Sequence, residues 1–136
     1  MTNEAVIVEL LGDRGDVMQF IVADGTAIAK GAILQLVDNR TAEASAADKP
    51  VAGIACSEKA ASDGQTTLGC YTHGIFDLVD SGAGGNVGLN VVLGGANLVK
   101  DAAGGNAESG LIFGKRLATS GAGGTEEVLV HVGKHF

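Results

Sequence analysis

The sequence has little charge, few aromatic rings, two cysteines and a single proline. Charged residues make up 18% of the 136 residues, and there is one tyrosine and no tryptophan. Two cysteines are too few for a disulfide framework. The nine lysines and arginines form no cluster, and the formal net charge is −7. Because affinity for a nucleic-acid backbone comes from clustered cations, we expect no nucleic-acid partner.

Long hydrophobic runs are also missing. No apolar run approaches the ~18 residues that a membrane-spanning helix needs, so no membrane partner is expected. The first 16 residues carry acidic side chains where a secretory signal requires basic ones. These features predict a soluble protein that is made and kept in a cytoplasm, or in something assembled there.

Glycine and small apolar residues are what the sequence has in quantity. Apolar residues make up 46% of the chain, which excludes an ordinary charge-rich disordered tail. The 22 glycines do not suit long helices, because each interior glycine costs about 1 kcal/mol relative to alanine. The same glycines suit the tight turns of a β protein.

Short runs of strand-forming residues alternate with turn signals along the whole chain. Strands are predicted over residues 4–11, 17–23, 32–38, 41–44, 51–57, 66–79, 111–118 and 125–132. No 12-residue stretch has a helical period, so at most one short helix is expected, within residues 86–93. The loop sequence SGAGG occurs at 81 and at 120 without matching flanks, which indicates shared loop chemistry and no repeat. The expected fold is mainly β, a single compact barrel-like or sandwich-like domain with glycine-rich loops.

The segment 66–79 is the clearest predicted strand, and it is expected to form a hairpin with residues 51–57. Its apolar face would carry Leu68, Cys70, Phe76 and Leu78, and its other face Tyr71, His73 and Asp77. Cys56 and Cys70 would both point inward. They are either two small buried hydrophobic residues or, if the register brings their Cα atoms within about 7 Å, a disulfide.

The predicted first strand differs from the others because both of its faces are apolar. A strand at a chain end with two apolar faces needs cover on both sides, from its own domain and from a second subunit or a partner protein. We therefore divide the chain into an N-terminal arm, residues 1–16, and a β-rich domain, residues 17–136. The candidate partner-binding residues are Glu4, Ala5, Val6, Ile7, Val8, Glu9, Leu10 and Leu11.

No motif for catalysis, a cofactor or a metal stands out. The glycine-rich loops lack the spacing of a phosphate-binding loop, and no serine lies in a nucleophile elbow. His131 and His135 lie in a strand pattern, where residues four apart are separated by about 13 Å. We expect a protein that is not an enzyme and has no cofactor and no metal site. A small enzyme or cofactor carrier built from Asp63, His73 and Asp77 is kept as an alternative.

Several segments in order along the chain resemble the phage capsid decoration, or cement, proteins, the family that includes the head decoration protein of lambda-like phages. The resemblance rests on KGAILQLVD (30–38), AGIA (52–55), YTHGIFD (71–77) and the ending LIFGKRLATSGAGGTEEVLVHVG (111–133).

The resemblance implies a β-tulip type domain with an N-terminal arm and no catalysis. It implies a virion protein on the outer capsid surface, a homotrimer at three-fold and quasi-three-fold positions of an expanded capsid. Its partner would be the major capsid protein, and residues 4–11 are our candidate for a strand added to a capsid sheet edge. The alternative is a head-surface or fibre domain that binds a host receptor or glycan through its glycine-rich loops.

Overall fold

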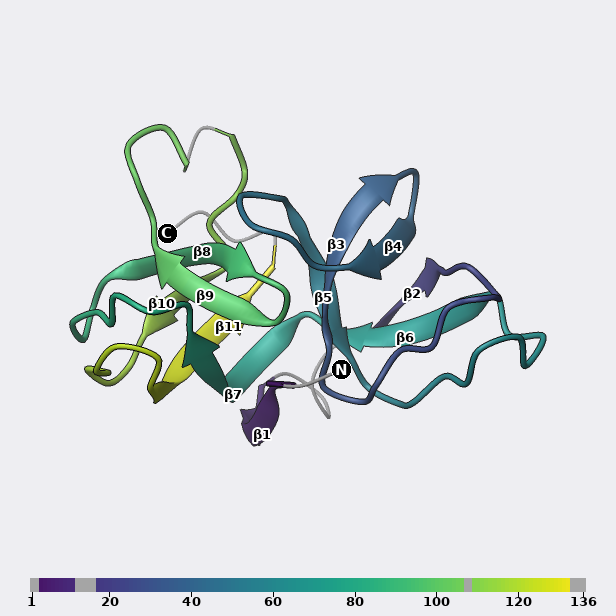
Figure 1. Cartoon of the computed structure of the whole chain (residues 1–136), viewed down its shortest axis with the longest axis horizontal. Coiled ribbons are helices and arrows are strands. Elements are labelled where there is room, and N and C mark those ends of the chain that lie inside the picture. Colours follow the sequence, from purple (N-terminus) through teal and green to yellow (C-terminus); the bar gives the residue numbers. More distant parts are fainter. Residues whose placement is uncertain (1–2, 12–16, 107–108, 133–136) are drawn as a thin grey trace.

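The computed structural model describes residues 3–11, 17–106 and 109–132. These residues contain no helix and form the strands β1 (Val6–Leu10), β2 (Val17–Ile21), β3 (Ile33–Asp38), β4 (Thr41–Ala44), β5 (Val51–Ala55), β6 (Thr67–Tyr71), β7 (His73–Asp80), β8 (Asn90–Gly95), β9 (Leu98–Asp101), β10 (Gly114–Arg116) and β11 (Thr125–His131). The predicted mainly β, barrel-like fold is confirmed. The structure adds that the strands close into two barrels packed side by side (Figure 1).

Barrel 1 consists of β2 to β6, in the closed order β2-β4-β3-β5-β6. All its neighbouring strands are antiparallel except β2 and β4, which pair in parallel through Ile21 and Thr41. Its interior is filled by small and medium-sized apolar side chains, including Phe20, Leu34 and Leu68.

Barrel 2 consists of β7 to β11 and closes in the same way. Its order is β7-β11-β10-β8-β9, and the parallel pairing of β9 with β7 through Val79 and Leu98 completes the ring. The strand β1 lies outside this ring and pairs antiparallel with the first half of β7. The second half of the same edge of β7 pairs with β9.

The two barrels have the same topology, with β2 to β6 corresponding in order to β7 to β11. Equivalent hydrogen bonds support this match. The amide of Gly31 donates to the carbonyl of Ala55 at 2.9 Å, and the amide of Gly88 donates to the carbonyl of Arg116 at 2.8 Å. The chain is therefore a structural duplication. Both SGAGG loops lie in barrel 2, where Gly85 bridges Ser120, so they are not equivalent positions of the duplication.

The predicted single strand over 66–79 is wrong in one respect, because it is divided between the two barrels. Leu68 and Cys70 belong to β6 and fill barrel 1, whereas Phe76 and Leu78 belong to β7 and fill barrel 2. Inward-facing and outward-facing positions alternate without a break through this segment, which hides the point where the chain passes from barrel 1 to barrel 2. The alternation is unbroken because both barrels bury the same face of the chain. The predicted hairpin is present as the antiparallel pair β5–β6.

The two cysteines do not share a face, which corrects the expectation that both point inward. Ala55 is the partner of Cys70 across β5 and β6, so the neighbouring Cys56 lies on the opposite face of the sheet. Cys70 is buried inside barrel 1, Cys56 is half-buried outside it, and both thiols are free.

Each barrel is closed at one end by a buried cation. In barrel 1 the Lys59 amino group donates to the carbonyls of Asp24, Thr26 and Ala60 at 2.5, 3.2 and 3.0 Å. In barrel 2 the Arg116 guanidinium donates to three carboxylates, those of Asp80, Asp101 and Glu126. These networks hold the loops at the barrel ends and are structural, because each cation is fully buried and already has several partners.

Candidate protein-binding edge

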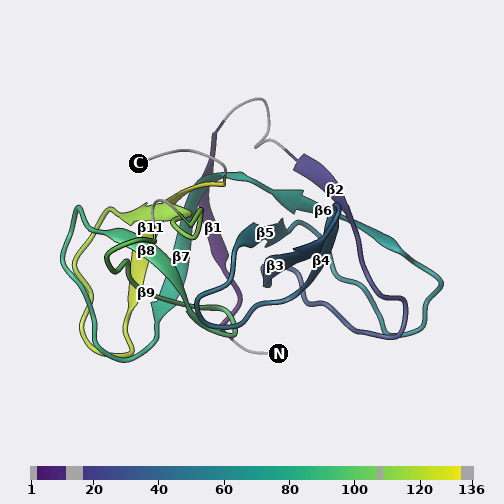
Figure 2. The same ribbon diagram turned by 90° about the horizontal axis from the view of Figure 1, so that it is seen from above.

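The strand β1 lies at the junction of the two barrels (Figure 2). On one edge it pairs with β7, from Val6 opposite Asp77 to Leu10 opposite Gly74. A Cβ atom at Gly74 would lie 2.9 Å from the carbonyl oxygen of Glu9, so glycine at this position allows β1 to approach β7 closely. Its other edge pairs with no strand among the described residues.

The two ends of β1 are fixed to the rest of the molecule. The amide of Ala5 donates to the carbonyl of Gly31 in barrel 1 at 2.6 Å, and the Ala5 side chain is buried. Leu10, at the other end, packs against the core of barrel 2. Residues 5–10 are therefore held in an extended conformation before any partner binds.

The middle of β1 exposes apolar side chains. Val6, with 59% of its surface exposed, is followed by the exposed Ile7 and Val8. A bulge between Ile7 and Glu9 interrupts the alternation that the sequence predicts for this strand. Three consecutive exposed apolar residues beside a free strand edge are typical of a surface that binds an extended segment of another protein.

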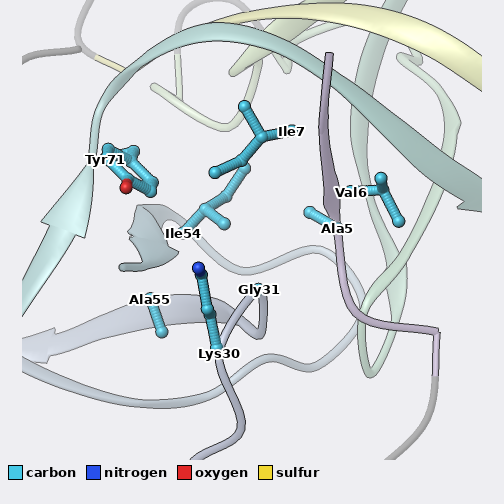
Figure 3. Close-up of a pocket in the computed structure, with 8 residues that line it drawn as sticks. All are labelled: Ala5, Val6, Ile7, Lys30, Gly31, Ile54, Ala55 and Tyr71. Carbon is cyan, nitrogen blue, oxygen red and sulfur yellow. The ribbon is translucent and has the colours of Figure 1, made fainter. Parts of the chain in front are cut away.

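A groove of about 330 Å³ runs between β1 and barrel 1. It is lined by Ala5, Val6, Ile7, Lys30, Gly31, Ile54, Ala55 and Tyr71 (Figure 3). Its walls are apolar except for Lys30, whose amino group extends toward Ile54 in the close-up, and for the ring hydroxyl of Tyr71. This groove could hold the side chains of an extended peptide that pairs with β1, with Lys30 facing an acidic group.

The structure therefore places the predicted partner-binding residues in one extended segment, though not all of them on the surface. Val6, Ile7, Val8 and Glu9 are exposed, whereas Ala5 is buried. Sequence reasoning missed the contribution of barrel 1 to this site. No signal near Lys30 or Tyr71 could have shown that these residues lie beside a strand so distant in the sequence.

The alternative site built from Asp63, His73 and Asp77 is not assembled. Asp63 lies in a barrel 1 loop and forms an ion pair with Lys59 at 3.3 Å, whereas His73 and Asp77 lie on the outer face of β7. His73 instead stacks on His131 of β11, with ring centroids 4.0 Å apart. Within the described ranges, no group of three or more His, Cys, Asp or Glu side chains could hold a metal ion.

Comparison with known proteins assigns this chain to no family. No protein-family model matches the chain, and no curated protein matches it. Among the described residues there is no helix that could span a membrane.

Proposed function

We propose that this protein is a structural virion protein that decorates the outer surface of an expanded icosahedral phage capsid. It acts as a homotrimer at three-fold and quasi-three-fold positions, clamps neighbouring major capsid subunits and stabilises the DNA-filled head. It is made in the host cytoplasm, performs no catalysis and needs no cofactor. The proposal rests on the sequence resemblance to decoration proteins, and the free apolar edge of β1 is the structural observation that supports it.

The edge of β1 suits such a role because its backbone is already ordered. A capsid strand that pairs with β1 gains main-chain hydrogen bonds, and Val6 and Val8 offer apolar surface for its side chains. A segment that is fixed in its bound conformation loses little conformational entropy on binding. A clip that contacts several capsid subunits adds binding free energy that must be lost before these subunits separate.

The first experiment measures the copy number of this protein in purified virions of the phage that encodes it. Quantitative mass spectrometry against the major capsid protein should give a ratio near one to one for a decoration protein that covers the lattice. A few copies per particle would contradict the proposal and indicate a fibre or portal-associated protein. Absence from virions would exclude a virion function altogether.

The second experiment tests the β1 edge itself. Val6→Lys together with Val8→Lys should weaken binding to expanded capsids at least about tenfold, because burying each valine is worth about 1.5 kcal/mol and 1.4 kcal/mol is a factor of ten. Leu117→Lys is the matched control, since Leu117 is similarly exposed on barrel 2 away from β1. Equal binding of the double variant and the control would remove β1 from the capsid contact.

A further inference from the structure

Two of the three histidines of the chain lie directly opposite each other on the outer face of barrel 2. His73 is the first residue of β7, His131 is the last residue of β11, and the two are register partners. Their imidazole rings stack with centroids 4.0 Å apart and with planes inclined by 25°. Both side chains are half-buried, so the pair is partly open to solvent. Sequence reasoning compared His131 with His135, which lies outside the described residues, and gave no sign of this contact.

The backbone brings these two side chains as close together as a β-sheet allows. The amide of His131 donates to the carbonyl of Phe113 at 3.0 Å, on the side away from β7. The next amide, that of Val132, donates to the carbonyl of Thr72 at 2.8 Å. His73 and His131 therefore form a non-hydrogen-bonded pair, in which the Cα atoms lie only about 4.5 Å apart. Seven consecutive register pairs hold β7 against β11, so this spacing is fixed by the fold.

Two imidazoles held in this way suit a transition-metal ion. Imidazole nitrogen is a good ligand for Zn²⁺, Cu²⁺ and Ni²⁺, whereas Ca²⁺ and Mg²⁺ prefer oxygen. With Zn–N distances of about 2.0–2.1 Å and a tetrahedral angle, two ligating nitrogens lie about 3.3 Å apart. The two rings are 4.0 Å apart at their centroids and closer along one side, because their planes are inclined. A rotation of each ring about its Cβ–Cγ bond, which is a soft torsion, brings one nitrogen of each ring to the required separation.

The surroundings of the pair are compatible with a bound cation. Glu9 is the register partner of Ile75, the next residue on this face of β7. Lys115 is the register partner of Leu129, the preceding residue on this face of β11. The pair thus lies between one acidic and one basic residue, in a chain whose formal net charge is −7. Among the described residues no third His, Cys, Asp or Glu side chain completes a ligand group, so water fills the remaining coordination positions.

We propose that His73 and His131 form a binding site for a divalent transition-metal ion of the zinc type. The ion links the first residue of β7 to the last residue of β11, where the chain passes from barrel 1 to barrel 2. It acts as a staple between two strands, because an ion that binds only the folded chain stabilises the fold by mass action. The inference goes beyond the proposed function and does not depend on capsid binding.

The test is a calorimetric titration of the full chain with zinc chloride at pH 7.5. His73→Gln and His131→Gln should each weaken zinc binding at least about tenfold, since even the loss of an outer-shell partner typically costs a metal site about 10–100-fold. His135→Gln removes the remaining histidine and is the matched control, which should bind zinc like the unmodified protein. A titration with calcium chloride should give the same result for all four proteins.

Two further readouts distinguish a metal site from a stack that only supports the fold. Zinc should raise the midpoint of thermal unfolding of the unmodified protein and of His135→Gln, but not that of His73→Gln or His131→Gln. Zinc binding should also weaken between pH 7.5 and pH 5.5, because protons compete with the metal for the imidazole nitrogens. Zinc held by surface carboxylates would show little change over this range.

Circular dichroism checks the folding of each variant, and threonine, which favours strands, replaces glutamine if a glutamine variant unfolds. The inference is overturned if zinc binds more weakly than about 1 mM, or if both β-strand variants bind zinc like the unmodified protein. It is also overturned if His135→Gln abolishes binding. A loss of stability in His73→Gln or His131→Gln without zinc binding by the unmodified protein would show that the pair is structural only, and would overturn the inference as well.

Discussion

Gly31 and Gly88 hold the same position in the two barrels and share the same left-handed backbone, with φ of +88° and +91°. Their surroundings differ. A Cβ atom on Gly31 would lie 2.5 Å from the carbonyl oxygen of Ala5, whereas a Cβ atom on Gly88 would meet no atom of the described residues within 4 Å. The difference arises because the N-terminal segment packs against this turn of barrel 1 through Ala5.

Substituting each of the two glycines by alanine tests how β1 is attached to barrel 1. Gly88→Ala should cost about 1–2 kcal/mol, the strain of a left-handed alanine. Gly31→Ala should cost more, because it adds a backbone collision with Ala5, and it should loosen β1. Urea unfolding measures the free energies, and hydrogen exchange of the β1 amides measures the loosening. Equal effects of the two substitutions would contradict the contact between Gly31 and Ala5.

Arg116 is predicted to be essential for the stability of barrel 2. Arg116→Met leaves the buried carboxylates of Asp80 and Glu126 without their cation, which should cost about 3–5 kcal/mol in urea unfolding. Adding Glu126→Gln should recover part of this loss, because it neutralises one of the two carboxylates. Lys49→Met, at an exposed position, is the control and should change stability by less than about 0.5 kcal/mol. A small effect of Arg116→Met would show that the network does not stabilise the fold.

Asp80 should make the stability of the protein depend on pH in acid. Burial alone would raise the pKa of Asp80, but the amides of Gly82 and Gly84 and the guanidinium of Arg116 outweigh it and lower that pKa. A carboxyl with a lowered folded-state pKa stabilises the protein fully above its ordinary pKa of about 3.9 and loses this contribution as pH falls through the folded-state value.

The measurement compares Asp80→Asn with the unmodified protein by urea unfolding from pH 7 to pH 2. The variant should be less stable at pH 7, and the difference should shrink below about pH 4. Asp77→Asn should be neutral or slightly stabilising, since Asp77 lies directly opposite Glu127 on the outer face. A difference for Asp80→Asn that is constant over this range would show that the charge of Asp80 is not the cause.

The two thiols should react very differently. Burial, together with the nearby Cys56, raises the pKa of the Cys70 thiol to about 12, so its reactive thiolate is scarce at neutral pH. Cys56 lies half-buried on the outer face of barrel 1. Iodoacetamide should label one cysteine in the folded protein and two in denaturant, as counted by mass spectrometry. No labelling in denaturant without a reductant would instead indicate a disulfide.

Strand positions were largely predictable from residue type. Val128 and Val130 lie at the alternate positions that the sequence predicts to point inward, and both are fully buried in β11. The buried Arg116 and Glu126 were not predictable, because an ion pair between strands depends on register. The duplication was equally hidden, because equivalent positions carry different residues: by register, the exposed Met18 of β2 corresponds to the fully buried Phe76 of β7.

The sequence by itself determined that this chain is a turn-rich β protein with a doubly apolar first strand. Those properties are local, since they follow from glycine, β-branched residues and alternation within a few positions. Only the tertiary structure decided that the strands close into two like barrels, that the chain changes barrel between Tyr71 and His73, and that β1 lies against both. These features depend on contacts between residues far apart in the chain, because closure and register come from which apolar faces meet and not from the local pattern.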